Sequence, residues 1–97
     1  MTLINYDIDI DLKIVNTIVL QKGETASMVQ LRYNACGTTY KLESHLSNLV
    51  RWGLVTDKKP TKNGVARQLK LKMDYGDCMS VLMRLKEAIE TVNEFFD

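Results

Sequence analysis

The stretch that decides the fold is TTYKLESHLSNLVRWGLV, residues 38–55. Its apolar side chains recur at the spacing of one helix face, and they are Leu42, Leu46, Leu49 and Val50. Thr38 or Thr39 supplies the hydroxyl that caps a helix N-terminus. Gly53 is typical of the residue just after a helix end. The pattern predicts a helix that starts near Thr39, followed by a strand that starts with Leu54 and Val55.

Two shorter helices are expected before this one. The first follows a cap at Asp9 or Asp11 and closes at Lys22-Gly23, and its apolar positions are Leu12, Val15, Ile18 and Val19. The second starts at Thr25 or Ser27 and stops near Cys36-Gly37. Ahead of both, isoleucine and tyrosine alternate with polar residues from Ile4 to Asp11, which predicts an extended arm or a short edge strand.

A basic hairpin and a long helix are expected after residue 55. Asn63-Gly64 is a strong turn signal between Val55-Thr56-Asp57 and a returning strand from Val65 to Met73. From Cys78 to Phe96 the apolar residues follow a heptad, with spacings of four, three, four, three and four: Cys78, Leu82, Leu85, Ile89, Val92 and Phe96. Val81, Ala88 and Phe95 widen this stripe beyond what one helix seam needs, which leaves surface for a partner helix.

The net charge of +1 conceals a strong polarity along the chain. Residues 28–72 hold nine basic and two acidic residues, a net charge of +7. Residues 1–27 carry −2 and residues 73–97 carry −4. A basic middle between acidic ends is the distribution expected when one part of a domain meets phosphates.

The order of elements predicts an α+β, mainly α fold: a winged helix-turn-helix with a two-stranded β-wing and a long C-terminal dimerisation helix. Ninety-seven residues suffice for one such domain. We expect an N-terminal arm over 1–10, a winged-helix core over 11–73 and a dimerisation helix over 78–96.

Part of this stretch also resembles a known group of regulators. His45-Leu46, Leu49 and Gly53-Leu54-Val55 fall in the register of the recognition helix of arsenic-repressor-type (ArsR) and MarR-type proteins. The resemblance covers roughly residues 25–73 and implies a winged-helix fold and DNA binding. Metal-sensing members carry a cysteine pair or terminal-helix histidines, which this chain lacks, and MarR-type drug sensors are usually longer, so neither sensor type is expected.

In a helix-turn-helix the second helix enters the major groove, and here that is the helix from Thr39. The expected DNA-binding residues lie on this helix and on the hairpin, and they are Thr38, Thr39, Tyr40, Lys41, Ser44, Ser47, Asn48, Lys58, Lys59, Lys62 and Arg67. The expected dimer interface is Leu82, Leu85, Ile89, Val92 and Phe96.

Other conspicuous residues have a structural interpretation. His45 lies between Leu42 and Leu49, which favours a core or boundary histidine with a satisfied hydrogen bond. Trp52 is expected to pack under the wing. Asp7, Asp9 and Asp11 are expected on a solvated edge, since they lack the glycine and final glutamate of a calcium loop.

Several classes of function are not expected. We find no phosphate-binding glycine loop, no nucleophile–base pair and no metal cluster, so neither enzyme activity nor a cofactor is predicted. Cys36 and Cys78 are 42 positions apart and are interpreted as reduced core thiols. The chain has no apolar run of membrane-spanning length and no secretion signal, which predicts a cytoplasmic or nucleoid-associated protein.

The expected function is sequence-specific binding of double-stranded DNA at a pseudo-palindromic site by a homodimer that acts as a transcriptional regulator, most simply a repressor. An origin- or centromere-binding adaptor of a plasmid or virus has the same sequence features. A winged-helix protein–protein module is a third alternative, since fold does not settle function.

Overall fold

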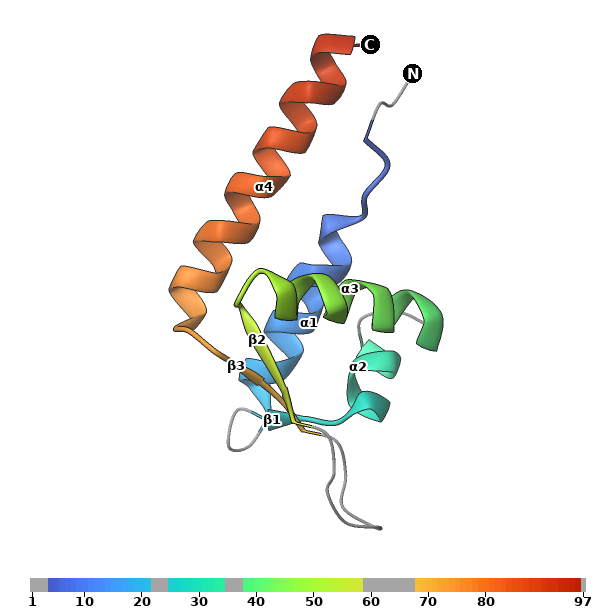
Figure 1. The fold of residues 1–97 in the computed structure, drawn as a ribbon, viewed down its shortest axis with the longest axis vertical. Helices are drawn as coiled ribbons and strands as arrows, with labels where there is room; N and C mark the ends of the chain where they lie inside the picture. The colour runs from blue at the N-terminus through green and yellow to red at the C-terminus, as the bar shows by residue number, and fades with distance from the viewer. Residues whose placement is uncertain (1–3, 22–24, 35–37, 59–67, 97) are drawn as a thin grey trace.

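The computed structural model describes residues 4–21, 25–34, 38–58 and 68–96. Along this part of the chain lie α1 (Ile8–Leu20), β1 (Thr25–Ala26), α2 (Met28–Asn34), α3 (Thr39–Arg51), β2 (Val55–Lys58), β3 (Gln68–Leu71) and α4 (Tyr75–Phe96) (Figure 1). The fold is mainly helical with a small antiparallel sheet, so the predicted α+β, mainly α class is confirmed.

The sheet has the order β1-β3-β2 among the described residues. The predicted antiparallel pair is present, with Val55 opposite Leu71 and Lys58 opposite Gln68. The expected Asn63-Gly64 turn lies outside the described residues. Strand β1 was not predicted, because two residues are too few to show an alternating pattern. It forms by pairing with β3, where Thr25 lies opposite Lys70.

Helix α1 begins earlier than the sequence predicted. The alternation of apolar and polar residues suggested extended chain to residue 10, but the helix begins at Ile8, directly after Asp7. Ile8 and Ile10 are both buried and belong to the core that gathers around α1. The extended arm is therefore confined to residues 4–7 of the described chain.

The helices α2 and α3 begin and end as the sequence signals predicted. Ser27 and Gln30 form a capping box at α2, since the Ser27 N–H donates to Oε1 of Gln30 and the Gln30 N–H donates to Oγ of Ser27. Oγ1 of Thr38 accepts from the Lys41 N–H at the start of α3. At its end Gly53 has φ 78°, and the Leu54 N–H bonds back to the Leu49 carbonyl at 3.0 Å.

The core gathers around α1 and takes side chains from every helix. It contains Ile8, Ile10, Ile14, Val15, Ile18, Leu31, Leu42, Leu46, Leu49, Leu54, Val55, Leu69, Cys78 and Leu82. Leu82 was predicted at a dimer seam, but it is fully buried within its own chain, which makes it a core residue.

The long helix α4 begins at Tyr75 rather than Cys78 and extends past the body of the domain beside the N-terminal arm (Figure 1). Asn93 holds the arm there, since its Oδ1 accepts from the Ile4 N–H at 2.8 Å and its Nδ2 donates to the Ile4 carbonyl at 3.0 Å. One side-chain amide thus satisfies both backbone groups of Ile4.

Candidate nucleic-acid interface

Helix α3 has a buried face and a polar exposed face. Leu42, Leu46 and Leu49 are buried in the core. On the opposite side the residues at spacings of four, three and four are all exposed, and they form what we call the outer stripe of α3: Tyr40, Ser44, Ser47 and Arg51. Tyr40 leaves 86% of its surface exposed. Hydroxyl and guanidinium groups of this kind reach base edges and phosphates in protein–DNA complexes.

Arg51 was not among the predicted DNA-binding residues. It is exposed at the last position of α3, one helical turn after Ser47 on the same stripe. The signal was present in the sequence, because extending the spacing of Tyr40, Ser44 and Ser47 by four residues arrives at Arg51. A recognition helix is expected to read bases with its N-terminal half, whereas Arg51 lies at the opposite end.

The other predicted residues near the start of α3 are also exposed. Thr38, Thr39 and Lys41 are all on the surface. Arg32 of α2 approaches this end of α3, where its Nη1 donates to Oγ1 of Thr39 at 3.4 Å. The surface at the first turn of α3 thus combines hydroxyls with two cationic side chains, that of Lys41 and that of Arg32 from α2.

Asn48 does not lie on the outer stripe. Its side chain is half-buried, and its Nδ2 donates to the Tyr6 hydroxyl at 3.3 Å. Asn48 was expected among the DNA-contacting residues of this helix, whereas its amide lies away from the outer stripe. Asn48 is turned toward the N-terminal arm because its place on the helix lies between the buried and exposed faces.

The strands β2 and β3 present a polar face of their own. Thr56 lies opposite Lys70 and Lys58 lies opposite Gln68, and all four residues are exposed. Leu69 and Val55 point the other way into the core. Lys59, Lys62 and Arg67, which were predicted to contact DNA, lie outside the described residues.

The basic character of the middle of the chain is carried at the surface. Every basic residue that the structure describes between positions 28 and 72 is exposed: Arg32, Lys41, Arg51, Lys58, Lys70 and Lys72. By contrast, the acidic Glu43 and Asp57 of the same stretch are each half-buried. Positive charge therefore dominates the solvent-facing side chains of this region.

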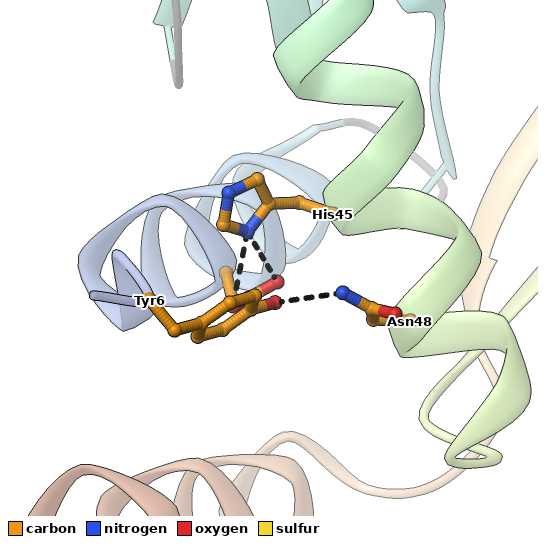
Figure 2. Close-up of polar contacts among 4 residues, drawn as sticks. Tyr6, His45 and Asn48 are labelled. Atoms are coloured by element: carbon orange, nitrogen blue, oxygen red, sulfur yellow. Dashed lines mark hydrogen bonds and ion pairs between the residues drawn. The ribbon is translucent and has the colours of Figure 1, made fainter. Parts of the chain in front are cut away.

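A buried polar cluster supports α3 from behind. Nδ1 of His45 lies 3.2 Å from both carboxylate oxygens of Asp11, which is fully buried in α1. The Tyr6 hydroxyl hydrogen-bonds Asp11 and accepts from Asn48. Figure 2 shows His45 and Asn48 reaching from α3 toward Tyr6. With Asp11 ionised, its oxygens only accept, so Nδ1 of His45 must carry a proton.

Burial sets the acid–base character of this cluster. Removal from water raises the pKa of Asp11, while the hydrogen bonds from Tyr6 and His45 act in the opposite direction. Burial and the bond to Asp11 raise the pKa of Tyr6 above its ordinary value, which lies well above neutral pH already, so the hydroxyl remains a hydrogen-bond donor. His45 is thus the core histidine that the sequence predicted, whereas the expectation that Asp11 lies on a solvated edge is wrong.

Trp52 contacts the arm. Its ring meets that of Tyr6 edge-on, with centroids 6.2 Å apart, while the Tyr6 ring also lies against His45 at 4.8 Å. Trp52 remains 40% exposed. Trp52 thus packs against the N-terminal arm. Residues 59–67 of the expected wing lie outside the described residues, so the position of Trp52 under the wing stays a prediction.

The residues predicted for a dimer seam do not share one environment, since Leu82 lies in the core and others are only half-buried. Leu85 and Ile89 are half-buried and line an open hollow of about 290 Å³, together with Ile4, Tyr6, Asn48 and Trp52. Val92 is also half-buried. Phe96 is the last residue of α4, and its side chain lies outside what the structure describes.

The described residues offer no group of three or more histidine, cysteine or carboxylate side chains placed to hold a metal ion. Cys78 is a free, buried cysteine, and burial raises the pKa of its thiol, which disfavours the thiolate form. Across the ranges described, no helix combines the length and apolar character needed to span a bilayer. No protein-family model, no curated protein and no solved structure matches this chain.

Proposed function

We propose that this chain is a winged helix-turn-helix protein that binds double-stranded DNA as a homodimer and regulates transcription, most simply by occupying a promoter. In this assignment α2 and α3 form the helix-turn-helix, β2 and β3 form the wing, and α4 mediates dimerisation. The protein acts without a cofactor, and its preferred site is pseudo-palindromic because the protein is two-fold symmetric.

The outer stripe of α3 is the observation that carries the proposal. Tyr40, Ser44, Ser47 and Arg51 project from a helix whose other face is anchored by three buried leucines and by His45. A rigid helix with an uncovered row of hydrogen-bonding side chains suits insertion into the major groove. The exposed cations around it supply the attraction for phosphates that precedes base recognition.

The test is a genome-wide footprint of the tagged protein, followed by affinity measurements on the best site and on random duplex of equal length. Ser44→Ala and Ser47→Ala should each cost about 1 kcal/mol on the specific site and little on random DNA. Ser80→Ala, at an exposed serine of α4, is the matched control and should change neither affinity.

The pattern of footprints separates the alternatives. Footprints across promoters support the regulator, whereas one cluster at a replication origin or centromere indicates a DNA-binding adaptor. Absence of binding to any duplex at low salt would exclude both and favour the protein–protein module.

A further inference from the structure

Helix α4 carries two apolar faces. The first contains Cys78 and Leu82, both buried, and the half-buried Leu85 and Ile89. A helix turns by about 100° per residue, so Val81 lies about 100° around from Leu82. With Val81 begins a second stripe of α4, which consists of Val81, Ala88, Val92 and Phe95.

Within the described parts of the chain, the core and the N-terminal arm pack against the first face. Leu82 packs into the core, and the N-terminal arm lies beside Leu85 and Ile89, held by the two hydrogen bonds between Ile4 and Asn93. On the second stripe Val81 is 41% exposed and Phe95 is 80% exposed, Ala88 is exposed, and Val92 is half-buried. The second stripe is thus a mostly exposed apolar surface on a helix whose first face is packed against the core and the arm.

The second stripe has the repeat of a two-helix seam. The half-buried Leu85 lies at the boundary between the two faces, and together with it the residues of the second stripe follow spacings of four, three, four and three over a length of about 21 Å. We propose that a second copy of this chain covers it, with the two α4 helices packed antiparallel and crossing near Ala88. This inference rests on the homodimer of the proposed function and assigns its contact surface and orientation.

Charge favours the antiparallel orientation. Residues 85–97 hold one lysine and four acidic residues, a net charge of −3, whereas residues 75–84 hold only Asp77 and Arg84 and are neutral. Parallel packing would set two acidic halves side by side. Antiparallel packing sets each acidic half beside the neutral half of the partner's helix, which removes this like-charge repulsion.

The shape of the protomer favours the same orientation. The body of the domain lies at the N-terminal half of α4, and the C-terminal half extends beyond it (Figure 1). In an antiparallel pair the extending half of each helix lies along the half that carries the partner's body. The two bodies are then at opposite ends of the pair, and Val81 lies level with the partner's Phe95.

A matched pair of substitutions tests the surface. Val81 and Met83 are equally exposed, at 41%, but lie on different sides of α4. Sedimentation equilibrium should show that Val81→Glu weakens dimerisation at least about tenfold, while Met83→Glu leaves it unchanged. Circular dichroism of both variants checks that α4 still folds. Equal effects of the two substitutions would overturn the assigned surface.

A distance measurement tests the orientation. The measured distance is the one between two nitroxide labels, one at position 80 of each copy. Each label is attached through a hydroxylamine to a ketone-bearing residue that replaces the exposed Ser80, so both cysteines stay in place. Antiparallel crossing at Ala88 separates the two copies of position 80 by about 24 Å along the helices, whereas parallel packing leaves them about 10 Å apart. A short distance overturns the antiparallel arrangement.

The two proposals can fail separately. A wild-type protein that stays monomeric at about 100 µM overturns the dimer inferred here, even if it binds DNA. An antiparallel dimer that binds no duplex leaves this inference standing and overturns the proposed function.

Discussion

Asp11 and His45 form a buried pair that joins α1 to α3, with Nδ1 of the histidine 3.2 Å from each oxygen of the carboxylate. The carboxylate has no exposed surface, and the Tyr6 hydroxyl also bonds to it. The pair therefore fixes the proposed DNA-reading helix against the centre of the core through groups that need one another to remain buried.

Removing the Asp11 carboxylate should lower the free energy of unfolding. Asp11→Ala leaves Nδ1 of His45 and the Tyr6 hydroxyl without an acceptor in the core, and we expect a loss of about 2–4 kcal/mol of unfolding free energy in urea titrations. Asp9→Ala is the control on the same helix, since Asp9 is exposed and its ion pair with Lys86 lies at the surface. That substitution should cost at most about 0.5 kcal/mol. Similar losses for both would show that the buried pair is not specially stabilising.

The raised pKa of Asp11 predicts how stability changes with pH. Because the native state holds this proton more tightly than the unfolded state, the contribution to stability is complete below the ordinary aspartate pKa and is lost as pH rises through the native value. The unfolding free energy of the wild type minus that of Asp11→Asn should therefore fall as pH rises from about 4 toward neutrality. Urea titrations of both proteins at matched pH measure it, and a difference that grows with pH contradicts the sign.

The end of α3 depends on a glycine in the left-handed region. Gly53 has φ 78°, and beyond its two chain neighbours no atom lies within 4 Å of the place that a methyl group would take, so a side chain there meets backbone strain rather than a clash. Gly53→Ala should cost about 1 kcal/mol or slightly more. Gly76→Ala, in α4 and equally uncrowded, should stabilise by up to about 1 kcal/mol. Thermal and urea unfolding of the pair measure this contrast, and a loss at both sites would contradict it.

The exposed lysines of the sheet test phosphate contact. Lys58 and Lys70 are exposed on β2 and β3. If each neutralises one phosphate, Lys58→Ala or Lys70→Ala should flatten the slope of log K against log salt by about 0.9 per subunit, or about two per dimer, on specific and random DNA alike. Lys13→Ala, at an exposed lysine of α1, is the charge-matched control. Unchanged slopes for both sheet variants would mean that this face does not meet the backbone.

Much of the local structure could be predicted because its causes are local. The period of Leu42, Leu46 and Leu49, the cap at Thr38 and the glycine at position 53 define α3 within one contiguous stretch. The same reasoning located β2, β3 and the long last helix, with errors of a few residues at their ends. Hydrogen bonds within a few residues and the side-chain period determine such elements.

Other features depended on contacts between distant parts of the chain. The pattern from Ile4 to Asp11 fits both an extended segment and the first turn of a helix, and only packing of Ile8 and Ile10 into the core selects the helix from residue 8. Strand β1 exists through its pairing with β3, where Thr25 meets Lys70 from a distant part of the sequence. Neither the start of α1 at residue 8 nor the formation of β1 has a local sequence signal strong enough to predict it.

The sequence by itself determined that α3 has an apolar inner face and a polar outer one, that positive charge collects between residues 28 and 72, and that α4 has more apolar surface than one seam requires. Only the tertiary structure decided that Asp11 is buried against His45, that Asn48 bonds to the arm, and that Leu82 belongs to the core. The physical reason is that the helical period specifies which residues share a face. The segments that cover that face, here α1 and the arm, lie far away in sequence, so the period of the helix does not specify them.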